Sequence, residues 1–426
     1  MFRLLTISLS LVVLPLCLEA QAGFDQYYTT GAVRYDFELV GDHSGEEVIH
    51  MQTKYLPNWG GNPNLLVDSS NLGTYRYQVF ESRSGNLIFQ KGFSPLFMEW
   101  QTTAEAKQRK RAYYQALFFP RPKSDVTIRI QNRDVNNAWQ TIYTDSVLTD
   151  NYFIVDETFD RYDVDTLTFS GDPAHKIDLV VLAEGYKTEE FDKFVKDTRR
   201  LTDHLLSVNP FCDYKDRFNI YAVKVPSVDS GTSVPGEHIY KNTAFNSHYY
   251  TFDTPRYLTS DDMKSIYNAI DGLGWDHIYL LVNTERYGGG GMYNFLTVCT
   301  TDDERSPFVF CHEFGHGFAG LGDEYYSSST SYEEFYGKDT EPWEPNLTSL
   351  VDFDSKWKAM VDHDVPVPTP RDSIYFNRVG VFEGGGYVAK GIYSPVMSCW
   401  MKEHTANGFC PVCQKAIERA ILLQTQ

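Results

Sequence analysis

Hydrophobic and polar residues alternate along the N-terminal third of the chain. Residues 74–80 and 126–131 alternate with a period of two, which is typical of antiparallel strands that have one buried and one polar face. A single helix is expected over residues 103–113, between these strands. The pattern predicts an antiparallel, β-sandwich-like accessory domain over residues 23–165.

The hydrophobic pattern changes in the rest of the chain. Residues 177–183 and 278–282 are short and nearly continuously apolar, as expected for strands that are buried on both faces. Residues 189–206 place their apolar side chains at helical spacing. Strands that alternate with helices predict an α/β domain over residues 170–426, and the acidic, irregular segment 160–174 is interpreted as a linker.

Composition and charge narrow the classes of function. With 42% hydrophobic and 22% charged residues, the chain can bury large cores. Its 38 lysine and arginine residues against 57 aspartate and glutamate residues give a formal net charge of −19, the opposite of the basic surface that nucleic-acid binding requires. Beyond the N-terminus, no run approaches the roughly 18 apolar residues of a membrane helix. We therefore predict no nucleic-acid partner and no membrane span.

The N-terminus has the features of a secretory signal peptide. Arg3 is followed by the apolar run 4–18 and by an Ala-x-Ala site that ends at Ala22. Cleavage after Ala22 would remove residues 1–22, and the protein is predicted to be secreted or exported to the cell envelope. Lipidation at Cys17 is disfavoured because a leucine, not a small residue, precedes it.

Six cysteines remain after this cleavage. An even number in an exported protein permits disulfides, but sequence alone cannot choose the pairing. Cys410 and Cys413 form a C-x-x-C segment, and no second such segment completes a four-thiolate zinc site. We expect instead a structural disulfide that involves Cys399.

The candidate chemistry lies on one predicted helix, which begins at Ser306-Pro307. His312 and His316 are four residues apart, so both imidazoles point to one side of the helix, as one zinc ion requires. Glu313 lies beside them, where it would act as general base on the attacking water and then pass the proton to the leaving amine. This His-Glu-x-x-His pattern is the metallopeptidase motif.

A catalytic zinc ion normally has three protein ligands, so one more is needed. The residues after His316 are similar to the metzincin pattern with one residue inserted and a carboxylate in place of the third histidine. Asp323 is the predicted third ligand, and Glu324 is the alternative.

The segment from His312 to Tyr325 resembles the HExxHxxxGxxDE signature of the IgA-specific metallopeptidase family, a family of secreted bacterial enzymes. Other stretches agree with this family and span most of residues 176–420: 181–186, 341–348, 382–387, 399–401 and 409–413. The resemblance implies a metzincin-like zinc endopeptidase that uses one catalytic Zn²⁺ and acts on a protein or peptide. The family name refers to an immunoglobulin substrate, which we do not predict for this chain.

The resemblance also implies roles for residues near the C-terminus. A methionine-bearing turn beneath the metal is expected at Met401, with Met397 as the alternative. Tyr393, just ahead of this turn, is a candidate donor to the tetrahedral oxyanion.

Substrate binding is expected beside residues 293–299, an alternating segment that would suit an edge strand to which an extended peptide could pair. The glycines at 288–291 are interpreted as a tight turn or a mobile lid. Two other functions stay open at this point. One is a secreted glycan- or protein-binding protein with a structural metal, and the other is a zinc hydrolase that acts on a non-peptide substrate.

Overall fold

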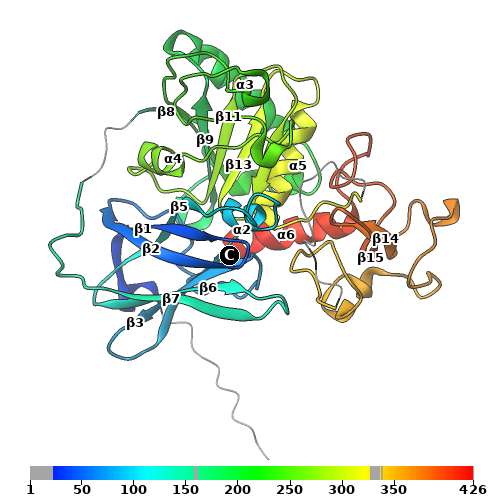
Figure 1. Ribbon diagram of the computed structural model, residues 1–426, viewed down its shortest axis with the longest axis horizontal. Helices are drawn as coiled ribbons and strands as arrows, with labels where there is room; N and C mark the ends of the chain where they lie inside the picture. Colours follow the sequence, from blue (N-terminus) through cyan, green and yellow to red (C-terminus); the bar gives the residue numbers. More distant parts are fainter. Residues whose placement is uncertain (1–22, 158–161, 327–335, 337–338, 426) are drawn as a thin grey trace, which may run out of the picture.

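The computed structural model describes residues 23–157, 162–326, 336 and 339–425 (Figure 1). The predicted signal peptide lies outside the described residues. Within this part of the chain, every helix is too short or too polar to cross a membrane.

The N-terminal part contains two antiparallel sheets, which follow a short helix α1 (Phe24–Tyr27). The first sheet has the order β2 (Gly45–Leu56), β1 (Tyr28–Asp42) and β5 (Arg111–Pro122). The second has the order β4 (Leu87–Phe93), β3 (Tyr75–Glu81), β6 (Val126–Arg133) and β7 (Trp139–Val147). Side chains of both sheets share one hydrophobic core. Burial alternates along much of β5 and β6, as expected for strands with one face towards that core.

The helix expected over residues 103–113 is wrong. A short helix, α2 (Leu96–Gln101), lies just before that segment, and β5 takes up its end. The Thr103 hydroxyl donates a hydrogen bond to the Trp100 carbonyl (2.7 Å), a local contact that favours a turn over further helix. From Tyr113 onward, the period-two burial of β5 against β1 outweighs the local helical propensity.

The C-terminal part is built on a mixed six-stranded sheet. Its order is β12 (Gly289–Met292), β13 (Leu296–Thr300), β11 (His277–Val282), β9 (Ile177–Glu184), β10 (Phe218–Lys224) and β8 (Asp163–Thr168). The four inner strands are parallel, and both edge strands are antiparallel to their neighbours. Every residue of β9 and β11 is buried, as expected from their continuous apolar runs.

Two assignments at the edges of this sheet are corrected. The segment interpreted as a linker contains β8, which pairs with β10 at one edge. The segment 293–299 does not supply the other edge, because β13 lies inside the sheet between β12 and β11. The edge strand is β12, formed by the glycines that were interpreted as a turn or lid. Pairing with β13 makes these glycines extended, although they carry no side-chain pattern of their own.

Helices flank the sheet, and a hairpin lies between the last two of them in the chain (Figure 1). The helices are α3 (Phe191–Leu205), α4 (Met263–Ala269), α5 (Ser306–Ala319) and α6 (Pro411–Thr425). The hairpin consists of β14 (Phe382–Gly385) and β15 (Val388–Ser394). Short 3-10 helices span Pro173–His175, Thr188–Glu190, Phe211–Arg217, Pro235–Glu237, Thr251–Asp253, Phe353–Ser355, Lys358–Met360 and Ser373–Tyr375.

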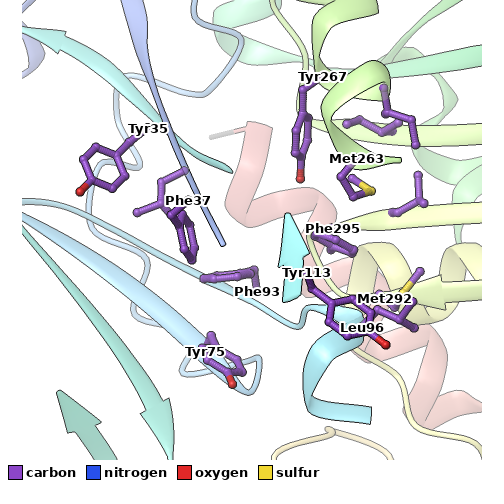
Figure 2. Close-up of a cluster of buried hydrophobic side chains, with 14 of the residues drawn as sticks. Tyr35, Phe37, Tyr75, Phe93, Leu96, Tyr113, Met263, Tyr267, Met292 and Phe295 are labelled. Carbon is purple, nitrogen blue, oxygen red and sulfur yellow. The ribbon is translucent and has the colours of Figure 1, made fainter. Parts of the chain in front are cut away.

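The two parts share a hydrophobic core (Figure 2). Figure 2 shows Phe93 and Leu96 of the N-terminal part in the same cluster as Met292 and Phe295 of the C-terminal part. Elsewhere in the same contact, the Phe118 ring meets the Trp275 ring edge-on with centroids 4.9 Å apart. The N-terminal sheets are therefore packed against the C-terminal sheet rather than tethered to it.

Buried ion pairs also cross this contact. Arg34 Nε lies 2.7 Å from Asp36 Oδ1, and Arg34 Nη1 lies 2.7 Å from Asp271 Oδ1. Lys54 Nζ lies 3.1 Å from the other oxygen of Asp271. All four side chains are at most 2% exposed. Asp271, which follows α4, thus compensates two buried cations of the N-terminal part, where an unpaired charge would be strongly unfavourable.

We predict that Asp271→Ala lowers the free energy of unfolding by about 3–5 kcal/mol, because it removes the buried carboxylate that pairs with both Arg34 and Lys54. Denaturant unfolding measures the change. Asp354→Ala is the matched control: Asp354 pairs with Lys358 but is 80% exposed, and its loss is expected to change stability by less than about 1 kcal/mol. Equal effects of the two substitutions would contradict the prediction.

Candidate metal centre

Helix α5 is held by packing on several sides. Phe310, Phe314 and Phe318 are buried in a second hydrophobic core, and the Phe310 ring stacks on Tyr279 of β11 with centroids 4.0 Å apart. The helix begins at Ser306 and has a proline in its first turn, as predicted. This packing fixes the helix and therefore the direction of its two histidines.

The chain reverses sharply at the end of α5. Gly320 adopts a left-handed conformation (φ 63°), and its N–H donates to the His316 carbonyl (3.1 Å). The N–H of Leu321 reaches back to the Gly315 carbonyl (3.2 Å). Glycine tolerates this conformation best, and an added Cβ would lie 2.8 Å from the Trp343 ring. This reversal of the chain brings Asp323 back alongside α5.

Three candidate ligand atoms form a nearly equilateral triangle. The Nε2 atoms of His312 and His316 lie 3.2 Å apart. Asp323 Oδ1 lies 3.2 Å from the first and 3.3 Å from the second. Two ligands of a tetrahedral zinc ion, each at about 2.0–2.1 Å, are about 3.3 Å from one another. The triangle therefore fits one face of a zinc coordination tetrahedron.

Backbone carbonyls orient both imidazoles. His312 Nδ1 donates to the Trp400 carbonyl (2.8 Å), and His316 Nδ1 donates to the Leu321 carbonyl (2.5 Å). A carbonyl can only accept, so each Nδ1 carries a proton and each Nε2 can offer a lone pair to a metal. Such contacts fix the tautomer and the ring orientation of metal-ligating histidines.

Asp323 divides its two oxygens between different partners. Oδ2 accepts hydrogen bonds from the hydroxyls of Tyr325 (2.9 Å) and Tyr387 (2.5 Å). Oδ1 is buried, accepts no hydrogen bond from the described residues and faces the imidazoles. Burial alone would lower the pKa of His316, but the nearby Asp323 carboxylate raises it to about 9. A cation is therefore favoured beside Asp323, and a divalent metal ion would provide Oδ1 with the partner that it lacks among the described residues.

Glu313 lies between the histidines and the edge strand. Burial raises the pKa of its carboxyl above the usual value, although the histidines act in the opposite direction. A Cβ on Gly289 would lie 2.7 Å from Glu313 Oε1, and one on Gly291 would lie 2.9 Å from His316 Cβ. Glycines in β12 therefore allow this strand to approach the histidine helix more closely than other residues could.

These residues line a cleft of about 380 Å³. The cleft also receives Met98 and Glu99 from α2, so the N-terminal part supplies one of its walls. Arg256 and Tyr287 of the C-terminal part line it as well. Sequence reasoning missed all four, because each is far along the chain from the histidine motif and none belongs to a recognisable pattern.

The structure places the other predicted site residues as follows. Met401 is fully buried beneath α5, and an added Cβ on Gly315 would lie 3.1 Å from its sulfur. Met397, the alternative, is partly exposed. Tyr393 lies on β15, packs against the second core and is absent from the described lining of the cleft. The expected contact of Tyr393 with a reacting carbonyl therefore has no geometric support.

Four buried side chains converge on the far side of the Asp323 segment, and we call them the cysteine cluster: Glu324, Cys399, Cys410 and Cys413. Glu324, the alternative third ligand, thus points away from the histidines. The expected disulfide at Cys399 is wrong, because the six cysteines of the described residues are all free thiols. Cys399 Sγ lies 3.8 Å from Cys413 Sγ, and three sulfurs meet a carboxylate instead of forming one pair.

Two family models match the chain. The family model described as IgA Peptidase M64 matches residues 166–378 and 371–421. The model described as Peptidase M64 N-terminus matches residues 23–144. A search of curated proteins finds no match. The two family models together cover most of the chain, including the cleft and both of its walls.

We predict that Gly320→Ala destabilises the protein more than Gly408→Ala does. Both glycines have positive φ, so both substitutions introduce backbone strain of about 1 kcal/mol or more. Only Gly320 faces a close neighbour, the Trp343 ring, which adds about 1–3 kcal/mol of overpacking. Thermal or denaturant unfolding of the two variants measures the difference. A Gly408 variant as unstable as the Gly320 variant would contradict this account of the reversal.

Proposed function

The chain belongs to the IgA peptidase M64 family and is therefore a peptidase, and we propose that it is an exported, zinc-dependent endopeptidase of metzincin type. Export rests on the signal-peptide features of residues 1–22. Family membership implies a protein or peptide substrate. The proposal names no particular substrate protein, because the shape of the cleft does not identify one.

The observation that carries the zinc proposal is the triangle formed by His312 Nε2, His316 Nε2 and Asp323 Oδ1. Two neutral imidazoles and a carboxylate are a donor set that suits zinc, and their spacing fits its coordination tetrahedron. When bound, the zinc ion supplies Lewis-acid polarisation of the scissile carbonyl and lowers the pKa of the attacking water. The Nδ1–H contacts to Trp400 and Leu321 keep both imidazoles in the ligating tautomer.

Glu313 is proposed to move the proton. Its carboxylate lies next to the histidine pair and lines the cleft, so it can accept a proton from a water that attacks the peptide carbonyl. Because burial raises its pKa, the protonated carboxyl can then donate that proton to the leaving amine. One carboxyl group thereby serves as base and then as acid.

The substrate is proposed to bind in an extended form beside β12. The Gly289 carbonyl already accepts a hydrogen bond from the Leu258 N–H (3.3 Å), and the Tyr293 carbonyl accepts one from the Ser94 N–H (2.8 Å). Only residues 290–292 are therefore left for a peptide. Met98 and Glu99 of α2 face this segment across the cleft. A peptide bound there would contact both parts of the chain.

The alternatives find less support. A structural metal site normally has four protein ligands, whereas the histidine site offers three converging donor atoms beside a cleft. A binding protein would also need no base next to the metal ligands. A zinc hydrolase for non-peptide substrates is disfavoured by the family to which the chain belongs.

The decisive experiment compares the mature protein with its Glu313→Gln variant on a complex protein mixture, with new peptide termini identified by mass spectrometry. We expect cleavage by the wild type and a loss of about 10²–10⁴-fold in kcat/KM for the variant, because the base is removed. A chelator should abolish wild-type cleavage, and added Zn²⁺ should restore it.

The control is Glu304→Gln, a nearby exposed glutamate whose loss should leave the rate unchanged. Zinc content should be the same in all three proteins. No cleavage by the wild type despite bound zinc would favour a binding protein over the peptidase proposed here.

A second prediction concerns the donor to the oxyanion. Tyr287 and Tyr393 both pack against the second core, but of the two only Tyr287 is in the described lining of the cleft, where it interacts electrostatically with Glu313. We expect Tyr287→Phe to lower kcat by about 100-fold and to leave zinc content unchanged, since a donor to the developing charge is lost. Tyr393→Phe is the matched control and should stay within about twofold of the wild type. A larger loss of kcat in Tyr393→Phe than in Tyr287→Phe would show that Tyr393 is the donor to the oxyanion.

A further inference from the structure

The cysteine cluster has the composition and spacing of a second metal site. Its four candidate ligand atoms all lie within 4.8 Å of one another. Cys399 Sγ is 3.8 Å from Cys413 Sγ, and Cys413 Sγ is 3.1 Å from Glu324 Oε1. Two thiolates on a tetrahedral zinc ion, each at about 2.3 Å, are about 3.8 Å apart. The cluster can therefore accept an ion with little rearrangement.

The carboxylate of this cluster lacks a counter-charge in contact with it. Glu324 is fully buried, and its Oε2 accepts no hydrogen bond from the described residues. Lys402 is near enough to interact electrostatically, but its ammonium donates to Ser394 Oγ (2.7 Å) and the Val396 carbonyl (2.9 Å). Glu324 Oε1 accepts hydrogen bonds from Asn346 Nδ2 (3.1 Å) and Cys413 Sγ (3.1 Å), so the carboxyl group has polar partners but no cation in contact with it. A metal ion would supply that cation in a buried site where a charge is otherwise unfavourable.

Backbone N–H groups donate to two of the three sulfurs, Cys399 Sγ and Cys410 Sγ. The N–H groups of Met401 and Cys410 donate to Cys399 Sγ (3.4 and 3.3 Å). The Cys413 N–H donates to Cys410 Sγ (3.5 Å). Hydrogen bonds to a charged form favour that form, and such contacts around ligating atoms support metal sites.

A disulfide does not satisfy this arrangement. Three cysteines are an odd number, so any one bridge among them leaves one buried thiol, and it leaves Glu324 Oε2 without a hydrogen bond from the described residues. Three soft sulfur ligands also select zinc over magnesium or calcium, which prefer oxygen. The C-x-x-C spacing of Cys410 and Cys413 is common among structural zinc ligands.

We propose that the cysteine cluster binds a second zinc ion, with four protein ligands and no open position, as a structural site. The proposal does not rest on the catalytic role of the histidines, because none of the four ligands belongs to that site. The proposed ion has a structural role. It joins the segment after α5 to the turn at Cys399 and to the start of α6.

This ion would stabilise the supports of the histidine site. Glu324 directly follows Asp323, and its N–H donates to the Met401 carbonyl (2.7 Å). Cys399 directly precedes Trp400, whose carbonyl orients His312. An ion bound at the cysteine cluster would therefore help to hold the Asp323 carboxylate and the Trp400 carbonyl in position, and both contact the histidines.

The test measures metal content in the full chain, purified without chelator. We expect about two zinc ions per wild-type chain and about one in the His312→Ala/His316→Ala double variant. Cys413→Ser should contain about one, and Cys212→Ser, a cysteine outside the cluster, should keep about two. Intact mass under denaturing conditions reports any disulfide as the loss of two hydrogens.

Substitution with Co²⁺ distinguishes the sites by their ligands. Cobalt bound to thiolates gives a sulfur-to-metal charge-transfer absorption in the near ultraviolet, which a histidine and carboxylate site cannot give. This absorption should persist in the double-histidine variant and disappear in Cys413→Ser. If Cys413→Ser does not fold, the zinc content and the absorption of the double-histidine variant still test the proposal. A double-histidine variant without zinc and without this absorption, or a wild type with a disulfide in the cluster, would overturn the proposal.

Discussion

The histidine site depends on the electrostatic attraction between one carboxylate oxygen, Asp323 Oδ1, and two imidazole nitrogens. The other oxygen of Asp323 is held by two tyrosine hydroxyls, so Oδ1 cannot turn away to satisfy itself. It is buried and faces only His312 and His316. A buried anion in this position requires a cation, either a proton on an imidazole or a metal. The fold therefore brings the three candidate ligand atoms together through contacts of the protein alone.

Close packing around α5 is the second constraint on the site. An added Cβ on Gly291 would lie 2.3 Å from the Glu313 carbonyl, and one on Gly317 would lie 2.2 Å from Thr297 Oγ1. The helix and strands β12 and β13 can approach this closely only because both residues are glycine. This explains why the histidine helix contains glycines although they lower helix propensity. The local loss of propensity is offset by burial of the phenylalanine face of the helix.

Local patterns in the sequence could predict part of this structure. The spacing of His312 and His316 on an apolar helix predicts that the two imidazoles lie together, because helical geometry is local. The choice of Asp323 comes from the similarity to the metzincin pattern and leaves Glu324 open, because the direction of two adjacent carboxylates depends on the chain reversal at Gly320. The strand character of the glycines in β12 could not be predicted, since it comes from pairing with β13 and not from side chains. Nor could the wall formed by Glu99, because a contact between segments so far apart in the sequence leaves no local pattern.

Two adjacent residues connect the histidine site to the cysteine cluster. Asp323 faces the histidines and Glu324 faces the cysteines. These two residues are consecutive, so a single peptide bond joins the histidine site to the cysteine cluster. The same arrangement recurs in the neighbouring turn, where Cys399 enters the cluster while the carbonyl of Trp400 holds a histidine. A shift of either segment would change both groups at once. The geometry of the histidine site is therefore set by how firmly these two segments are held, and the Glu324 N–H bond to Met401 joins them directly.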